Sequence, residues 1–392
     1  VRQASGKVSM ASKKIAVCQM TSVADKKTNL GVVSQLVNDA ALVGAQMIFF
    51  PEACDYICDN KQDVVRQAEP ILGGEVVSQY RKLASKHKVW LSMGGIHERP
   101  DKMFNTHLII DDNGKIVQAY RKLHIFDVEI PEKKLRLKES DFSHSGSHIV
   151  TPVDTPVGRI GLSICYDLRF PEMSTSLNII GAHILTYPSA FTHTTGLAHW
   201  HTLLRARAIE NQCYVIAAAQ TGEHNAKRKS YGHALCVSPW GDVLADCGEE
   251  SPSFKIAEID IGELMRVRRN MPVFEHRRAD YGSGPVFAVL LYGDVSVMII
   301  YVPHISRRCV IPGHVLVAPL RAAERNRDLT EEEAGDFYKT IRLVQKLMEK
   351  VHNTQSCTVT IQDGVDAGQT VKVNIIYLFC IFHNNIFQIS PV

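Results

Sequence analysis

The sequence IGLSICYDLRFPE at residues 160–172 begins with an apolar run, IGLSI, that stops at Cys165. Two other apolar runs stop at a reactive residue: Glu52 follows IFFP, and Lys122 follows IVQAYR. In layered α/β proteins the carboxyl ends of strands line the ligand crevice. Hydrolysis of a carbon–nitrogen bond through a covalent intermediate needs a nucleophile, a base and an oxyanion stabiliser. A thiol, a carboxylate and an ammonium at three strand ends therefore indicate this chemistry.

The stretch around these residues alternates between short apolar runs and amphipathic segments. Apolar residues have helical spacing over 27–42 and 75–87, and Asp112-Asn113-Gly114 has the composition of a hairpin turn. The pattern predicts an α/β domain of layered sheets with helices outside them. Strands are expected at residues 14–19, 45–50, 89–94, 106–110, 115–120, 159–165, 183–187, 214–220, 234–238 and 243–246.

Length and composition limit the class of protein. A chain of 392 residues predicts two to three domains, and 45% hydrophobic with 22% charged residues is typical of globular proteins. A net charge of +3 does not call for nucleic acid or an acidic membrane as a partner. Ten cysteines without a Cys-x-x-Cys pair favour a reduced, cytoplasmic protein. The apolar segment 286–302 is interrupted by Gly293-Asp294, so we expect no membrane span.

The sequences around the three reactive residues resemble a known family. MIFFPEA, YRKLHIFD and GLSICYDLRFPE are similar to the three signatures of the nitrilase (carbon–nitrogen hydrolase) superfamily. The resemblance covers most of residues 13–282, and residues 187–225 and 231–241 resemble its amidase branch that acts on deaminated glutathione. It implies a four-layer α-β-β-α sandwich, homodimers or homotetramers, and no cofactor.

The resemblance also implies a role for each catalytic residue. Cys165 is the nucleophile, Glu52 the general base, and Lys122 stabilises the oxyanion together with the backbone N–H of Tyr166. Glu139, in KESDFSHSG, matches the family's second glutamate, which orients the lysine. Ammonia leaves, a thioester remains, and water then releases the acid.

The substrate pocket is expected beside the strand that ends at Tyr187. Ser189, Phe191 and Thr192 follow that strand and are the predicted substrate-binding residues. Three arginines could bind a substrate carboxylate, with structural pairing as the alternative: Arg169, Arg205 and Arg207.

Several other cysteines and histidines allow a simpler interpretation. Cys18, Cys213 and Cys236 are interpreted as small buried hydrophobes. Cys54 and Cys58 lack a second pair of ligands, so no metal site is expected from them. His193, His199 and His201 could contact substrate or, less readily, a metal ion, but histidines with a structural or surface role are the simplest interpretation.

Beyond the small-residue stretch at 281–285 the sequence changes character. Thr330, followed by three glutamates, is a capping-box pattern and predicts a helix that ends near Val351. Residues 310–333 and 362–372 resemble the fragile histidine triad (HIT) family of dinucleoside polyphosphate hydrolases. The resemblance implies nucleotide binding by Gln362, Gly368, Gln369, Thr370 and Val371.

The second domain departs from that family at its edges. After Lys372 the family has a strand with three alternating histidines, whereas this chain continues VNIIYLFCIFHNNIFQISPV, and no His-x-His-x-His occurs anywhere in it. His383 alone cannot replace the triad, and Ser306 stands where the family has asparagine. We therefore expect no dinucleoside triphosphate (Ap3A) hydrolysis, and poor folding of residues 285–392, whose apolar tail would lack a partner strand. A splicing variant or an error in the gene sequence would explain the departures.

The predicted organisation has five parts. Residues 1–12 form an N-terminal extension, in which Met10 has the context of a translation start, and 13–282 form the nitrilase-like domain. Residues 283–309 are a linker and atypical start, 310–372 an incomplete α+β HIT-like domain, and 373–392 an atypical apolar tail. A nitrilase-like domain followed by a HIT domain is the arrangement of an invertebrate fusion family.

The sequence therefore predicts an amidase that acts on a small ω-amide such as deaminated glutathione. An ω-amidase or N-carbamoyl hydrolase for another small acid is the alternative within enzymes, and nitrile hydrolysis is not favoured. A nucleotide-binding or signalling protein, with a dinucleoside polyphosphate as its ligand, is the alternative from another class.

Overall fold

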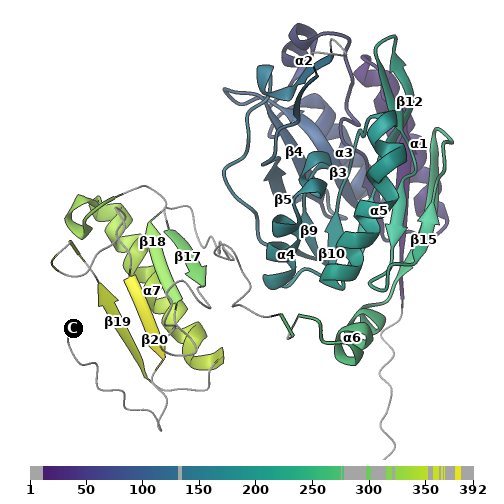
Figure 1. Ribbon diagram of the computed structural model, residues 1–392. Helices are drawn as coiled ribbons and strands as arrows, with labels where there is room; N and C mark the ends of the chain where they lie inside the picture. Colours follow the sequence, from purple (N-terminus) through teal and green to yellow (C-terminus); the bar gives the residue numbers. More distant parts are fainter. Residues whose placement is uncertain are drawn as a thin grey trace, which may run out of the picture. The chain divides into compact units, whose positions relative to one another are not determined.

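The computed structural model describes residues 12–130, 135–274, 276–277, 297–301, 315–319, 323–351, 356–361, 363–364, 366 and 376–380. The chain divides into two compact units, Val1–His276 and Arg277–Val392 (Figure 1). The helix and strand boundaries within each unit show how the predicted site residues are positioned.

The first unit contains two large sheets. Strands of the first sheet follow the order β13-β12-β1-β2-β3-β4-β5, and β16 pairs with β1. These strands are β1 (Lys13–Met20), β2 (Met47–Phe50), β3 (Trp90–Glu98), β4 (Phe104–Ile110), β5 (Ile116–Arg121), β12 (Ala219–Asn225), β13 (Arg228–Tyr231) and β16 (Ser253–Ile259). The expected hairpin at residues 112–114 joins β4 to β5, and Gly114 has the positive φ of +79° that this turn requires.

The second sheet has the order β15-β14-β11-β10-β9-β8. Its strands are β8 (Val153–Thr155), β9 (Gly158–Leu162), β10 (Ile184–Thr186), β11 (Tyr214–Ala217), β14 (Leu235–Val237) and β15 (Val243–Asp246). The short strands β6 (Asp127–Ile130) and β7 (Leu135–Lys138) form a separate hairpin.

Helices cover the outer faces of both sheets, which gives the expected α-β-β-α layers (Figure 1). Two helices pack on the first sheet, α1 (Lys26–Leu42) and α3 (Glu75–His87). Two others pack on the second sheet, α4 (Pro171–Ile179) and α5 (His193–Asn211). The remaining helices of this unit are α2 (Lys61–Gln67) and α6 (Ile261–Asn270).

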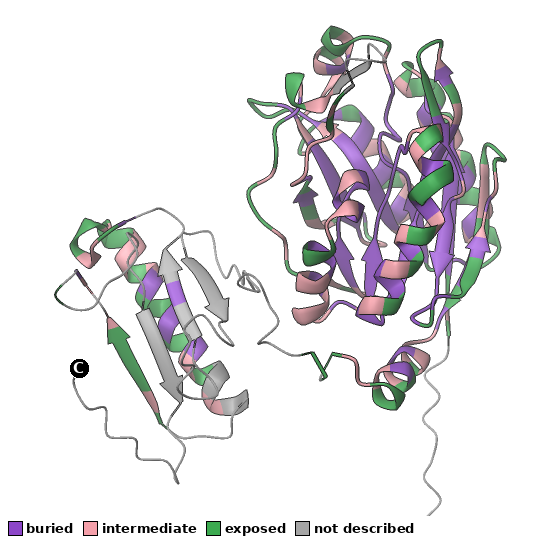
Figure 2. Cartoon of the chain, in the orientation of Figure 1, coloured by how far each residue is buried: buried purple, intermediate pink, exposed green. Residues whose placement is uncertain are grey.

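Side-chain alternation along β1 shows how one strand serves two layers. Ile15 and Val17 face the core between the sheets, whereas Ala16, Cys18 and Met20 face the helices α1 and α3. All five are fully buried, so the strand is a continuous apolar run rather than an alternating one (Figure 2). Burial on both faces explains why an apolar run is the sequence signal of the central strands.

The predicted strand 214–220 is two strands in different sheets. β11 pairs in parallel with β10 of the second sheet, and β12 pairs in parallel with β1 of the first. The chain therefore crosses between the sheets at Ala218, which is 2% exposed. Because the residues on either side of the crossing, Ala217 and Ala219, are both apolar and buried, hydrophobicity gives no signal of the change of sheet.

The described residues of the second unit form a four-stranded sheet and one long helix. Its strands follow the order β17-β18-β20-β19: β17 (Val297–Tyr301), β18 (Val315–Pro319), β19 (Cys357–Ile361) and β20 (Ile376–Cys380). The expected helix is α7 (Glu331–Val351), and its capping box is present: Glu333 N–H donates to Thr330 Oγ1 at 3.2 Å, and Thr330 N–H donates to Glu333 Oε2 at 2.8 Å.

One expectation about the last part of the chain needs correction. The apolar tail was expected to lack a partner strand, but its residues 376–380 form β20, which pairs with both β18 and β19. In the segment 286–302, for which no membrane span was expected, residues 297–301 form β17. Among the described residues, no helix has both the length and the apolar composition needed to cross a membrane.

Candidate active site

Glu52 lies in the turn after β2, and backbone contacts hold it from two sides. Ala53, with a φ of +57°, donates its N–H to Gly95 O at 2.9 Å, and Ala190 N–H donates to Glu52 Oε2 at 2.9 Å. A Cβ at Gly95 would lie 2.7 Å from Glu52 Cγ, so this position requires glycine. The carboxylate is consequently fixed before any ligand binds.

Lys122 follows β5 and brings two carboxylates together. Its Nζ donates to Glu52 Oε1 at 3.0 Å and to Glu139 Oε2 at 2.9 Å. Only 2% of its side chain is exposed. Glu139, in the turn after β7, also accepts the N–H of Phe126 at 2.9 Å. A buried ammonium is stable only when it is paired in this way.

Asn105, on β4, joins the same two carboxylates. Its Nδ2 donates to Glu52 Oε1 at 2.8 Å and to Glu139 Oε1 at 3.3 Å. Because both partners are acceptors, the amide nitrogen must point toward them. Its Oδ1 is left buried without a hydrogen-bond partner.

Cys165 lies in a sharp turn rather than at the end of the predicted strand. β9 ends at Leu162, and residues 165–169 form a short 3₁₀ turn. Cys165 has a φ of +46°, an unfavourable conformation for a residue with a Cβ, and its N–H donates to Pro188 O at 3.0 Å. The thiol lies beside the Glu52 carboxylate and the Lys122 ammonium, and both charges act on it. All four predicted catalytic side chains therefore form one cluster.

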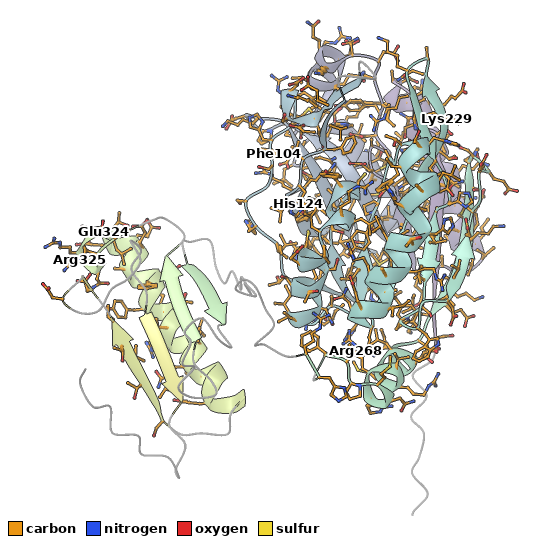
Figure 3. The ribbon with its side chains drawn as sticks, in the orientation of Figure 1. Phe104, His124, Lys229, Arg268, Glu324 and Arg325 are labelled. Atoms are coloured by element: carbon orange, nitrogen blue, oxygen red, sulfur yellow. The ribbon has the colours of Figure 1, made fainter. Side chains whose placement is uncertain are left out.

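Asp167 joins this turn to Tyr120 on β5, the strand that Lys122 follows. Its Oδ2 accepts the N–H of Ile164 at 2.8 Å and the hydroxyl of Tyr120 at 2.8 Å. Its Oδ1 accepts from Nδ1 of His124, which is labelled in Figure 3, at 2.7 Å. Asp167 is fully buried, so these donors replace the water that the carboxylate loses.

The charges of the cluster follow from its contacts. Burial opposes ionisation of Glu52, but the Lys122 ammonium and hydrogen bonds from Cys165 and Lys122 lower its pKa to about 2. Burial and the adjacent Glu52 carboxylate raise the pKa of the Cys165 thiol. Burial disfavours the charged form of Lys122, but Glu139 and Glu52 hold its pKa well above the ordinary value. The resting cluster is therefore thiol, carboxylate and ammonium.

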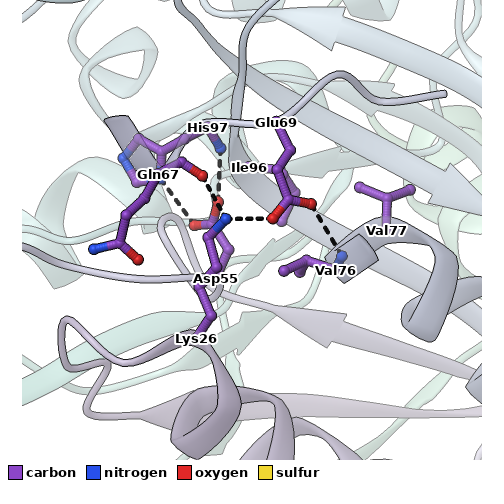
Figure 4. A pocket seen from close by; sticks show the side chains of 8 residues that line it. All are labelled: Lys26, Asp55, Gln67, Glu69, Val76, Val77, Ile96 and His97. Atoms are coloured by element: carbon purple, nitrogen blue, oxygen red, sulfur yellow. Dashed lines mark hydrogen bonds and ion pairs between the residues drawn. The ribbon is translucent and has the colours of Figure 1, made fainter. Parts of the chain in front are cut away.

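A second polar cluster supports the loop that follows Glu52 (Figure 4). Asp55 accepts the backbone N–H of His97 and its Nδ1, each at 2.9 Å. Lys26 pairs with Glu69 and donates to Gln67 O. The cavity among these residues has a volume of about 10 Å³, which is space for about one water molecule. It is too small for a substrate, so we assign the cluster a structural role.

The predicted substrate-binding residues differ in how accessible they are. Ser189 is fully buried and donates its hydroxyl to Tyr187 O at 2.9 Å, which favours a structural role. Phe191 packs against Trp200 and is 7% exposed. Thr192 precedes α5 and shares a hydrogen bond of 2.7 Å with Thr195. Contact of these residues with substrate stays a prediction.

Of the three candidate arginines, two have structural partners. Arg207 donates through Nε and Nη2 to Leu168 O, at 3.0 and 2.9 Å. Arg205 donates to Gly241 O at 2.8 Å. Arg169 has no carboxylate partner among the described residues, and its guanidinium carbon lies 5.4 Å from the centre of the Phe191 ring.

The three histidines on α5 do not form one cluster. His193 meets the edge of Tyr231, and His199 Nδ1 lies 3.4 Å from the guanidinium of Arg169. His201 instead contacts Asp246. Cys18, Cys213 and Cys236 are fully buried in the core, as expected of small hydrophobes.

The predicted nucleotide-binding residues cannot be placed. Gln362, Gly368, Gln369, Thr370 and Val371 lie outside the described residues, as do Ser306 and His383. Asp363, which follows Gln362 in the sequence, is described, and it pairs with Arg325, labelled in Figure 3, at 3.0 Å.

Sequence reasoning missed Asn105 and Asp167. Asn105 opens the run NTHLII on β4, and its two neighbours, Thr106 and His107, are also buried. Three consecutive buried polar residues in a strand are the signal that could have marked it. Asp167 lies two residues after Cys165 and is fully buried, but it does not itself follow an apolar run. The pattern that marks the three reactive residues therefore does not mark it.

Comparisons with known proteins agree with this architecture. The family model for carbon–nitrogen hydrolases matches residues 14–269, and that for HIT domains matches residues 301–373. The chain is 49% identical over 69% of its length to the deaminated glutathione amidase of Homo sapiens, of which it covers 84%. Its first unit is a carbon–nitrogen hydrolase of the amidase class.

Two fusion proteins match nearly the whole chain. NitFhit, the nitrilase and fragile histidine triad fusion protein of Drosophila melanogaster, is 46% identical over 91% of this chain and 81% of its own length. The crystal structure of Caenorhabditis elegans NitFhit has a TM-score of 0.68 and 43% identity, covering 97% of this chain and 96% of that one. The chain belongs to the family of nitrilase and fragile histidine triad fusion proteins.

Replacement of Lys122 by methionine tests the buried charge cluster. The change leaves Glu52 and Glu139 buried without a cation, so the free energy of unfolding should fall by about 3–5 kcal/mol at neutral pH. The loss should shrink as the pH falls, because protonation removes the uncompensated charge. Urea unfolding followed by tryptophan fluorescence reports this unit, since all three tryptophans lie in it.

Lys138→Met is the matched control. Lys138 pairs with Glu129 at 3.2 Å, where the side chains are 32% and 52% exposed, so its loss should cost less than about 1 kcal/mol. Equal effects of the two substitutions would show that the buried cluster is not what stabilises this region.

Proposed function

We propose that the first unit hydrolyses the amide bond of a small ω-amide, with deaminated glutathione as the favoured substrate. The observation that carries the proposal is the single cluster of Cys165, Glu52, Lys122 and Glu139, in which the first three residues are buried. The similarity to deaminated glutathione amidases supports the choice of substrate.

The reaction begins with proton transfer inside the cluster. Cys165 gives its thiol proton to Glu52 as the sulfur attacks the carbonyl carbon, and the oxygen becomes an oxyanion. Lys122 stabilises that charge together with the N–H of Tyr166, in the first turn after the nucleophile, where backbone donors lack partners within the helix. Because the thiol lies beside the Glu52 carboxylate, the proton passes directly between the two groups.

Collapse of the tetrahedral intermediate breaks the carbon–nitrogen bond. Glu52 returns its proton to the leaving nitrogen, and a thioester to Cys165 remains. Glu52 then takes a proton from water, which attacks the thioester and releases the acid and the thiol. A primary amide releases ammonia. Deaminated glutathione has a substituted amide nitrogen and releases an amine, so ammonia is not a general readout of activity.

Cys165→Ala should abolish amide hydrolysis, with a loss of more than roughly 10³-fold in kcat, because the thioester cannot form. Acid product should be measured by chromatography with deaminated glutathione and with a primary ω-amide. Cys58→Ala is the control, since that thiol is held by Gln67 outside the cluster and should retain activity. Full activity in Cys165→Ala would refute the mechanism.

Arg169 is the residue that we propose for binding a substrate carboxylate. It follows the nucleophile turn, lies beside the Phe191 and Tyr166 rings, and has no carboxylate partner among the residues that the structure describes. Deaminated glutathione carries carboxylates. A guanidinium without a carboxylate partner, in the turn that begins at Cys165, can bind one of them.

Arg169→Gln should raise KM for a carboxylate-bearing amide by about 10–100-fold, the value of one or two hydrogen bonds to a charged group. KM for a neutral amide of similar length should not change. Arg205→Gln is the control, because Arg205 contacts the carbonyl of Gly241. An equal rise for both substrates would show that Arg169 shapes the pocket rather than selecting charge.

For the second unit we propose that Ap3A hydrolysis is absent. The strand β20 has the sequence IYLFC, and the chain lacks the alternating histidines that the HIT resemblance requires for its nucleophile. A nucleotide-binding function is the alternative, because the HIT model still matches residues 301–373.

The full chain incubated with Ap3A should form no nucleotide products above the uncatalysed background. Ion-exchange chromatography measures this, and Cys165→Ala shows whether any signal comes from the first unit. Turnover that persists in Cys165→Ala would contradict the proposal. Sub-micromolar binding of a non-hydrolysable Ap3A analogue in calorimetry would instead favour the nucleotide-binding alternative.

The proposed setting is a reduced cytoplasm and an assembly of two or four copies. The eight cysteines that the structure describes are all free thiols. Ile209, Trp240, Val243 and Leu244 are apolar yet 42–58% exposed on α5 and the β14–β15 hairpin, which supports burial against a second copy.

A further inference from the structure

Three side chains from separate parts of the first unit converge outside the catalytic cluster. His201 lies on α5, His233 follows β13, and Asp246 is the last residue of β15. One ligand atom from each residue, an imidazole nitrogen of each histidine and a carboxylate oxygen of Asp246, lies within 4.8 Å of the other two. Neither the proposed hydrolysis nor the packing of the core uses this group.

The separations between these atoms suit a single metal ion. His201 Nε2 lies 3.1 Å from Asp246 Oδ2, and His233 Nδ1 lies 3.0 Å from Oδ1 and 3.1 Å from Oδ2. Ligands about 2.0–2.1 Å from a tetrahedral Zn²⁺ are about 3.3 Å apart. The histidine–carboxylate separations are within a few tenths of an ångström of this value, and the two imidazole nitrogens lie within 4.8 Å of each other.

The surrounding contacts hold the three groups in place. His233 has a φ of +58° and is fixed on both sides, since its N–H donates to Gly248 O at 2.7 Å and its carbonyl accepts Trp200 Nε1 at 2.8 Å. The Tyr231 ring stacks on the His233 imidazole with centres 4.7 Å apart. Gly248 N–H donates to Asp246 Oδ1 at 2.8 Å. Such outer contacts orient metal ligands.

Access and charge are also favourable. The side chains of His201, His233 and Asp246 are 36%, 23% and 30% exposed, so an ion can enter and keep water at a remaining position. Asp246 supplies a carboxylate beside the two imidazoles, so the donor set includes an anionic type of ligand for a cation.

We propose that His201, His233 and Asp246 form a binding site for a divalent transition-metal ion of the Zn²⁺ class. Two imidazoles and one carboxylate select such an ion over Mg²⁺ or Ca²⁺, which prefer sites made of oxygen alone. The ion would tie α5 to the segment after β13 and to the end of β15. Its expected role is structural, because no member of the catalytic cluster is among its ligands.

The alternative is a hydrogen-bonded histidine–aspartate–histidine group that binds no metal. Both interpretations account for the contacts, so metal binding itself must decide. Zn²⁺ alone is titrated into the full metal-free chain by calorimetry, and Co²⁺ is added as a spectroscopic probe. The proposal predicts one Zn²⁺ per chain, and visible Co²⁺ bands without the sulfur-to-cobalt charge transfer that a cysteine site would give.

His201→Gln and His233→Ala should each weaken Zn²⁺ binding by more than roughly 100-fold, because loss of outer contacts alone costs 10–100-fold. They should also abolish the rise in melting temperature that Zn²⁺ causes in the parent chain. His148→Ala is the matched control, since His148 is exposed and contacts Ser147 outside the site. Melting of each metal-free variant shows that it is folded.

Three results would overturn the proposal. They are no Zn²⁺ binding by the parent chain, affinity unchanged in the folded His201→Gln and His233→Ala variants, and a Co²⁺ spectrum dominated by sulfur ligation. In each case the three residues form only a hydrogen-bonded group. Amide hydrolysis is not a readout in this experiment, so failure of the metal site leaves the proposed function untouched.

Discussion

The buried ammonium of Lys122 is the constraint on which the candidate site depends. It is 2% exposed and contacts both Glu52 and Glu139, so three charged groups share one largely buried site. Burying any one of these charged groups alone would carry a large desolvation free energy. Their mutual attraction and hydrogen bonds offset most of that free energy. Asn105 donates to both carboxylates and fixes their separation. The same arrangement leaves Glu52 ionised beside a neutral thiol, ready to accept its proton.

Much of the first unit could be predicted from its sequence because its central strands are buried on both faces. Runs such as IAVC in β1 and MIFF in β2 have few other interpretations at that length. The helices α1 and α3 and the β4–β5 hairpin were predicted within one or two residues. The split of residues 214–220 between two sheets was not, since strand pairing is set by distant residues that a local pattern does not contain.

The site was predictable to the extent that its residues follow apolar runs. Glu52, Lys122 and Cys165 have that signal, whereas Asn105 lies at the start of β4 and contributes through contacts with residues far along the chain. His201 shows the same limit. The nearby His193 and His199 suggested a histidine cluster on the helix α5, but the side chain of His201 contacts Asp246, at the end of the strand β15. The spacing of residues in the sequence predicts which of them share a face of one helix or strand. It does not predict which other helices or strands pack against that face.

The passage of the chain between the sheets at Ala218 has a consequence for folding. Glu52 and Lys122 follow strands of the first sheet, whereas Cys165 follows a strand of the second. Gln220, just beyond the crossing, donates to the carbonyl of Glu52 at 3.0 Å, and Ala218 accepts the N–H of Ser189 at 2.9 Å. Neither layer holds a complete set of reacting groups. An early folding species with one sheet formed would therefore have no reactive centre, and catalytic competence arises only when the two layers dock.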